Sequence, residues 1–423
     1  MAVRVQGPFM PMPVANSPVG TQLINAIYQA SINTFQKPQI DQILLNPVAR
    51  EISPVDLGHA LVLSIHYFRD EYYGSILDLP AAQNIPANGQ GGIGHALTIV
   101  CRLQDPDILR SLKNHPMFVH INPNGAWGLG DALDAYLNAF IEERQLPDDP
   151  NPEYLQATML HPAANQINYT QPRANLIGKA LMYLAGQSEV AFRDEDTSIV
   201  NLLLSLNIAH LIQPNGEFGL GRVLANAAYG TTPDIVNAIL AHPASRSITS
   251  HATLITENEN TKAEEAGSSN QFGFTEAIFL AVDNGEPEVQ NPLILQKQIV
   301  QSLIQFTNMN NIPLDANGPF GLAKSLTVAS SDNPSLVPII LSSNSSLNIR
   351  PNAPDENSGG LNNALIHASS NEDVQAVQSI LQHPNARLIQ PTDFTEAHNL
   401  AVNSPQITQA IKSFVQLHQI GTN

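Results

Sequence analysis

The residues best suited to covalent chemistry are one cysteine and the histidines. Cys101 is the only cysteine, and 13 histidines are available as bases. A cysteine and a histidine need only lie close together to form a thiolate nucleophile, so one hypothesis is a hydrolase that uses Cys101 and a nearby histidine. The other interpretation is structural, because Cys101 follows Ala96, Leu97 and Val100 on a predicted helix, where a free cysteine packs as a small apolar side chain.

Histidines at His-Pro pairs are the obvious candidates for metal ligands. The pairs are His115-Pro116, His161-Pro162, His242-Pro243 and His383-Pro384. They occur one to each copy of a repeated segment, so they are not expected to converge on a single ion. Each follows a predicted helix, where a charged histidine interacts favourably with the terminal carbonyls. We therefore expect no metal site.

A glycine-rich stretch, residues 89–94, has the spacing of a dinucleotide-binding loop. That mechanism requires a buried strand before the loop, and residues 81–88 do not have the pattern of one. Glycine also recurs at the matching positions 128 and 130, and again at 219 and 221. The stretch is therefore predicted to be a turn of the repeat, and no cofactor is expected.

Acidic residues cluster at Glu142-Glu143 with Asp148-Asp149, and at Asp194-Glu195-Asp196. Paired carboxylates suit acid/base catalysis or a hard cation. Solvated inserted loops explain them more simply, and a recognition surface for a basic partner is the remaining alternative. The net charge of −18, from 19 Lys and Arg against 37 Asp and Glu, argues against nucleic acid and anionic membranes as partners.

The elements that must position these residues are helices, and residues 360–391 show them best. Ala364, Leu365 and Ala368 are spaced to share one face of a short first helix. Asn371 is predicted to cap a second helix, with Glu372 and Asp373 in its first turn. The apolar face of the second helix consists of Val374, Val377, Ile380 and Leu381. His383-Pro384 is expected to end this helix, after which the chain leaves as a loop.

This unit occurs about ten times, at spacings of 33 to 54 residues. The copies are anchored on the small residue of the first helix: Ala26, Ala60, Ala96, Ala132, Ala180, Val223, Ala277, Ser325, Ala364 and Ala397. Proline at the first turn of the second helix recurs in five copies, at Pro38, Pro106, Pro233, Pro334 and Pro405.

Paired short helices in units of about 33 residues resemble the ankyrin repeat. Its Thr-Pro-Leu-His-x-Ala pattern is degenerate here, nearest at residues 275–281 and 395–401, and an extended Ile-x-Pro segment replaces the usual turn, as at residues 389–391. The resemblance implies an all-α, ankyrin-like α-solenoid of about ten helix-turn-helix repeats with loop insertions. It also implies a non-catalytic scaffold that binds a partner protein through a concave face and loops. The Asn- and Gln-rich form is similar in style to ankyrin effectors that intracellular bacteria deliver into host cells.

We predict an N-terminal extension, residues 1–19, and one elongated repeat domain, residues 20–420. Insertions are predicted near 141–150, 187–196, 253–271 and 283–292. The sequence shows neither a Sec-type signal peptide nor a membrane span, so we expect a protein of the cytoplasm or one delivered into a host cell.

The best candidates for partner contacts lie in a motif that precedes the first helix. Asn-Gly-x-aromatic-Gly-Leu occurs three times, and the predicted binding residues are Asn124, Trp127, Asn215, Phe218, Asn317 and Phe320. The structural alternative is a hydrophobic staple, in which the aromatic ring packs on the following helix. Trp127, the only tryptophan, is the preferred contact anchor.

Overall fold

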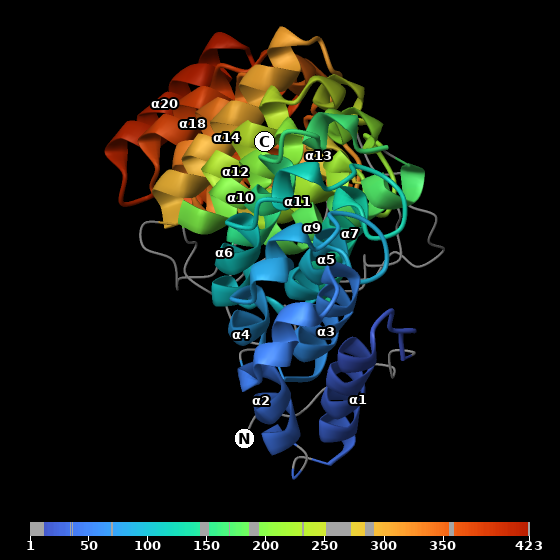
Figure 1. Ribbon diagram of the computed structural model, residues 1–423. Coiled ribbons are helices and arrows are strands. Elements are labelled where there is room, and N and C mark those ends of the chain that lie inside the picture. The colour runs from blue at the N-terminus through green and yellow to red at the C-terminus, as the bar shows by residue number, and fades with distance from the viewer. Residues whose placement is uncertain are drawn as a thin grey trace. The chain divides into compact units, whose positions relative to one another are not determined.

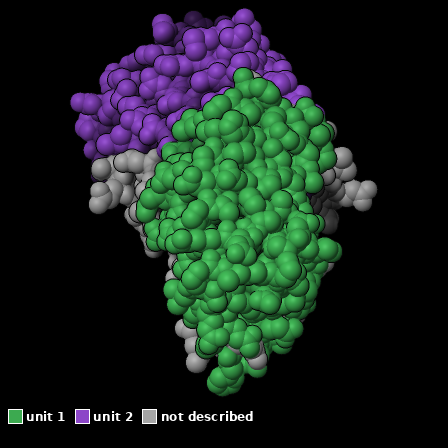
Figure 2. All heavy atoms as spheres, in the orientation of Figure 1, with its two compact units in different colours: residues 1–176 green, residues 177–423 purple. Residues whose placement is uncertain are grey.

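The chain divides into two compact units, residues 1–176 and 177–423 (Figure 2). The computed structural model describes residues 12–33, 35, 37–68, 71–143, 152–168, 170–185, 194–230, 232–250, 272–283, 292–354 and 359–421. Within these residues the secondary structure is helical and contains no strand. The prediction of an all-α protein is therefore confirmed. The prediction of one elongated domain stays a prediction.

Loops or short 3-10 helices separate most of the successive α-helices. In the first unit they are α1 (Pro18–Ile32), α2 (Lys37–Leu45), α3 (Pro54–Phe68), α4 (Tyr73–Leu77), α5 (Ile93–Leu103), α6 (Pro106–Lys113), α7 (Leu129–Glu143) and α8 (Pro152–Met159). Helix α9 (Gln171–Ala185) contains the boundary between the units. The second unit continues with α10 (Asp194–Ser205), α11 (Leu220–Tyr229), α12 (Pro233–Ala241), α13 (Phe274–Asp283), α14 (Pro292–Met309), α15 (Leu322–Asp332), α16 (Val337–Leu341), α17 (Leu361–Ser370), α18 (Val374–Leu381), α19 (Pro391–Leu400) and α20 (Pro405–Leu417).

Each unit has two layers of helices. In the first layer, α1, α3, α5 and α7 pack in succession within the first unit, and α11, α13, α15, α17 and α19 do so within the second. In the second layer, α6 packs on α8, and α10, α12, α14, α16, α18 and α20 follow one another. Figure 1 shows α12, α14, α18 and α20 as one such succession. Alternate helices of the sequence therefore belong to the same layer.

Nine of the ten anchor residues of the sequence alignment lie in the first-layer helices and the tenth, Ala180, lies in α9; all ten are buried. In α17, Ala364, Leu365 and Ala368 are fully buried, as the spacing predicted. Their small side chains leave room for the neighbouring first-layer helices to approach. In α18, Val377 and Ile380 are fully buried as well. Burying a side chain of that size stabilises the fold by roughly 1.5–3 kcal/mol.

The boundary between α17 and α18 differs from the prediction. Asn371 ends α17 instead of capping α18, and its amide donates to the carbonyls of Ser330 and Ser331 at 3.0 and 2.6 Å. Glu372 adopts a left-handed conformation with φ of 57°. The cap is Asp373, whose carboxylate accepts the Ala376 N–H at 2.7 Å. Asn371 is diverted because two carbonyls of the preceding copy lie within its reach.

The segment after the second helix is also more ordered than predicted. It forms a 3-10 helix of about one turn, as in residues Pro384–Leu388, and the isoleucine that follows is extended. Asn46-Pro47 and Leu79-Pro80 begin the same element. Such 3-10 helices occur at Pro47–Glu51, Pro80–Asn84, Phe118–His120, Ala164–Gln166, Asn207–Leu211, Pro243–Ser247, Asn344–Asn348 and Pro384–Leu388, whereas the 3-10 helix Pro334–Leu336 precedes α16. Each copy thus has two helices and, in most cases, a short third one.

The predicted insertions lie largely outside the described residues, which omit 144–151, 186–193, 251–271 and 284–291. Helix α1 begins at Pro18, inside the predicted N-terminal extension, with Ser17 as its cap. The buried carboxylate of Asp56 in α3 accepts the Ser17 hydroxyl and the Asn16 N–H, both at 2.7 Å. The described part of the extension is therefore attached to the second copy.

Candidate interaction surface

The loops that carry the predicted binding residues share one backbone conformation. We call residues 88–92, 124–128, 215–219 and 317–321 the finger loops. In each, the glycine at the last position donates its N–H to the carbonyl three residues earlier, at 2.9–3.1 Å. Each loop is also closed by a bond across seven residues, such as Leu129 N to Asn122 O at 2.9 Å and Leu220 N to Gln213 O at 3.0 Å. Gly125 and Gly216 have φ of 90° and 110°, a region that favours glycine.

The asparagine that begins each finger loop is bonded to the following copy. Asn215 Nδ2 donates to Ser247 O at 3.2 Å, and its Oδ1 accepts the Thr249 N–H at 2.8 Å. Asn317 does the same with Asn348 O and Arg350 N, both at 2.8 Å. We call this pair of bonds, which encloses a buried isoleucine of the following copy, an asparagine clamp.

Two further clamps belong to the first unit and one more to the second. Asn88 bonds His120 O at 3.1 Å and Asn122 N at 2.6 Å. Asn124 bonds Gln166 O at 2.8 Å and also accepts the Asn168 N–H. Asn352 bonds Leu388 O and Gln390 N, both at 3.0 Å. The polar groups of Asn124, Asn215 and Asn317 are thus engaged within the protein, and their predicted contact with a partner stays a prediction.

The aromatic residues of the finger loops are all half-buried. The Trp127 ring stacks on His95 of the preceding copy, with centroids 3.6 Å apart and planes at 24°. Phe320 likewise packs on the preceding copy, against Phe279, with ring centroids 5.2 Å apart and ring planes at 57°. Phe218 is held through its backbone, because its carbonyl lies where a Cβ on Gly178 would be only 2.2 Å away. The rings of Trp127 and Phe320 thus pack on the preceding copy, and all three aromatic residues keep part of their surface accessible.

Phe272 is a further aromatic residue that lies next to a first-layer helix. Its carbonyl is only 2.1 Å from where a Cβ on Gly221 of α11 would lie. The Arg222 guanidinium lies 5.3 Å from its ring centroid, a cation–π distance. Its position relative to α11 resembles that of Trp127 relative to α5. The periodic sequence motif identified the aromatic residues, but nothing in the sequence identified their partners.

His95 is the most unusual titratable group next to a finger loop. Its side chain is 3% exposed, and Nδ1 accepts the Gly91 N–H at 3.1 Å. Nε2 therefore carries the proton, and it is buried without a hydrogen-bond partner among the described residues. Burial, with smaller contributions from His59 and His66, lowers the pKa of His95 to about 4. His95 is neutral at physiological pH.

The His-Pro histidines connect successive copies. His115 Nε2 lies 2.9 Å from Ala82 O, His161 Nε2 2.9 Å from Phe118 O, and His383 Nε2 3.1 Å from Ser346 O. In each case Nδ1 accepts the N–H two residues later, and at His383 this bond caps the 3-10 helix. Burial lowers the pKa of His383 despite the opposing effect of its bond to Ser346.

The predicted role of these histidines, a charged contact with the carbonyls of their own helix, is therefore wrong. Nδ1 is an acceptor, so these bonds require the neutral ring, and the carbonyl that Nε2 contacts belongs to the preceding copy. Among the described residues no three His, Cys, Asp or Glu side chains form a group suited to hold a metal ion. Of the acidic clusters, Asp148 and Asp149 lie outside the described residues, and the side chains of residues 194–196 are not described.

Cys101 is fully buried in α5 as a free thiol. Burial alone raises its pKa well above the ordinary range for a thiol. No hydrogen bond joins it to a histidine among the described residues. A thiol that is both inaccessible and protonated cannot act as a nucleophile at neutral pH.

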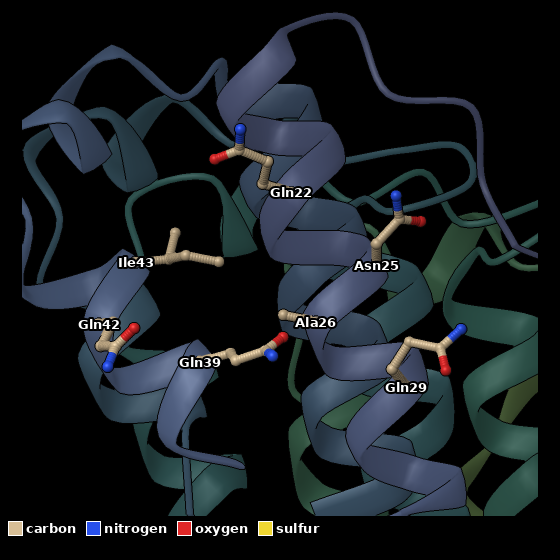
Figure 3. Close-up of a pocket in the computed structure, with 7 residues that line it drawn as sticks. All are labelled: Gln22, Asn25, Ala26, Gln29, Gln39, Gln42 and Ile43. Atoms are coloured by element: carbon tan, nitrogen blue, oxygen red, sulfur yellow. The ribbon is translucent and has the colours of Figure 1, made fainter. Parts of the chain in front are cut away.

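A groove lies between α1 and α2, with a volume of about 450 Å³ (Figure 3). Its lining is Gln22, Asn25, Ala26, Gln29, Gln39, Gln42 and Ile43. Five of the seven are neutral amides, and none carries a charge. By alignment, Gln22 and Gln29 correspond to Asp56 and Leu63 of α3, which are buried. The groove is thus a polar, uncharged face of the first copy.

No family model, curated protein sequence or solved structure matches this chain. None of the helices in the described part of the chain combines the length and apolar character needed to cross a bilayer.

Proposed function

We propose that this protein is a non-catalytic scaffold of the ankyrin-like solenoid type, which binds a partner protein through its first-layer helices and finger loops. The observation that carries the proposal is the state of the finger-loop aromatics. Trp127, Phe218 and Phe320 are half-buried on loops whose backbones are clamped to the next copy. An anchor held in place before binding loses little conformational entropy, and large aromatic side chains dominate binding energy at protein interfaces.

The ankyrin-like part of the proposal is supported by the arrangement of the copies. Helices of one layer pack on the corresponding helices of adjacent copies, and the sequence unit recurs in the same register. The 3-10 helix after the second helix distinguishes these copies from the family pattern. The resemblance in amino-acid composition to delivered bacterial effectors supports a host protein as the partner.

The burial of Cys101 favours the scaffold over the alternative hydrolase. A small alkylating agent is expected to leave Cys101 unmodified in the native protein and to label it completely in denaturant. Rapid native labelling that increases with pH would restore the hydrolase hypothesis.

Partner capture followed by binding measurements tests the scaffold directly. Tagged full-length protein is used to isolate partners from lysate, and each candidate is then titrated against purified variants. Trp127→Ala, and Phe218→Ala combined with Phe320→Ala, are expected to weaken the relevant complex by about 30-fold, which is the effect of about 2 kcal/mol.

Leu160→Ala and Leu347→Ala are the matched controls, because these side chains are 73% and 59% exposed and lie outside the finger loops. Circular dichroism establishes that all variants are folded. If folded aromatic variants bind as tightly as the controls, the finger loops are not the binding surface.

A further inference from the structure

Four of the five clamp asparagines precede a glycine. The pairs are Asn88-Gly89, Asn124-Gly125, Asn215-Gly216 and Asn317-Gly318, whereas Asn352 precedes Ala353. Asparagine followed by glycine is chemically labile, because glycine has no Cβ to hinder the approach of its backbone nitrogen to the asparagine side chain. The same four asparagines bond the following copy, so a reaction at any of them would change a contact between copies.

We propose that Asn88, Asn124, Asn215 and Asn317 are sites of deamidation that react only when the contact with the following copy opens. The glycine nitrogen bonds to the asparagine Cγ, the Cγ–Nδ2 bond breaks, and ammonia leaves with the proton from the glycine amide. Water then opens the resulting succinimide to aspartate or isoaspartate. The overall reaction consumes one water and releases one ammonia, with no change in oxidation state.

The clamp geometry prevents this reaction while the copies are in contact. Oδ1 and Nδ2 of Asn215 are both bonded to the following copy, to Thr249 N and Ser247 O. Both bonds direct the amide plane toward the following copy. For Cγ to meet the Gly216 nitrogen, which attacks perpendicular to the amide plane, the whole amide must turn, and this turn breaks both bonds. Opening of the contact is therefore required before attack.

The product cannot restore the clamp. A carboxylate only accepts hydrogen bonds, so at Asn215 a negative oxygen would face the Ser247 carbonyl where Nδ2 now donates. The same holds for His120 O, Gln166 O and Asn348 O at the other three sites. Once deamidation has occurred, the contact with the following copy therefore cannot close again. Isoaspartate also reroutes the main chain through the former side chain.

A site-resolved ageing experiment tests the requirement for opening. The full-length protein is incubated at mildly alkaline pH with and without denaturant, and peptide mapping by mass spectrometry follows aspartate and isoaspartate at each site. In denaturant, the four Asn-Gly sites should react at similar rates, and about tenfold or more faster than Asn352. In the native protein, each of the four should be slower by about tenfold or more. Equal rates in the two conditions would overturn the proposal.

A second measurement tests the effect on the contact. Asn215→Asp reproduces the aspartate product, and Asn352→Asp places the same charge in a clamp that lacks glycine. Both should increase native-state hydrogen exchange, at the Thr249 N–H in the first variant and at the Gln390 N–H in the second, each by about tenfold. Unchanged exchange at both amides in folded variants would show that the carboxylate is accommodated, contrary to the proposal.

Discussion

Finger loops 88–92 and 124–128 have the same backbone and the same clamp, yet they differ at the position of the aromatic residue. Loop 88–92 has Gly91 there, and the His59 ring of the preceding copy packs against its backbone, with Nε2 3.1 Å from Gln90 O. Loop 124–128 has Trp127, which stacks on His95. The shared loop conformation thus sets the position of the fourth residue, Gly91 or Trp127. The type of this residue decides whether the preceding copy contacts the loop backbone or an aromatic ring.

Filling the glycine position should have the largest effect. A Cβ on Gly91 would lie 2.1 Å from His59 Cδ2, and φ is 79°, so Gly91→Ala combines a steric clash with backbone strain. We expect the free energy of unfolding in urea to fall by about 3 kcal/mol. Gly89→Ala is the matched control, because its φ is 87° and no heavy atom lies within 4 Å. It should cost only about 1 kcal/mol. Equal decreases in the free energy of unfolding for the two variants would mean that the His59 ring moves away from the new side chain.

Acid should act on both loops through His95, because its Nδ1 accepts the Gly91 N–H and its ring stacks on Trp127. Burial lowers its pKa to about 4 from the ordinary 6.5, so the unfolded chain takes up a proton first as the pH falls. The stability contributed by neutral His95 is complete above pH 6.5 and is lost between pH 6.5 and 4, by about 2–3 kcal/mol.

Trp127 is the only tryptophan, so its fluorescence reports on this stack directly. In the native protein the emission should change with a midpoint near pH 4. His95→Gln should abolish this transition and reduce the acid sensitivity of unfolding. A midpoint at pH 6.5 would indicate that His95 is solvated.

The clamps should contribute equally in the two loops if they are independent of the aromatic position. Asn88→Ala and Asn124→Ala each remove two hydrogen bonds and leave a backbone N–H and carbonyl without their partner. We expect each to lower the free energy of unfolding by about 2 kcal/mol, measured by urea titration. A loss that is much greater at Asn124 would show that the clamp and the Trp127–His95 stack are coupled.

Removing the stack itself should have the smallest effect. Trp127→Ala deletes a half-buried ring and the 3.6 Å contact with His95, and we expect a loss of about 1 kcal/mol. Because φ at Trp127 is 64°, Trp127→Gly relieves backbone strain and should be less destabilising than Trp127→Ala. Thermal unfolding measured by circular dichroism compares the two. The reverse order would mean that the positive φ at this position does not strain a residue that has a Cβ.

Much of the helical framework was predictable from local sequence. Pro106, Pro233 and Pro405 begin helices as expected, and all ten anchors are buried in helices. These features depend on residues within one or two turns of each other. The cap of α18 was placed two residues too early because Asn371 and Asp373 are both good caps, and only the carbonyls of Ser330 and Ser331 decide between them.

The sequence by itself determined the helices, their repetition, and the positions of glycine and aromatic residues in the turns. Tertiary structure decided what the polar residues do. His383 bonds a carbonyl 37 residues earlier, and Asn317 bonds an amide 33 residues later. The reason is physical: a hydrogen bond requires its two atoms within about 3 Å, and the position of a partner in the next copy depends on how the copies pack.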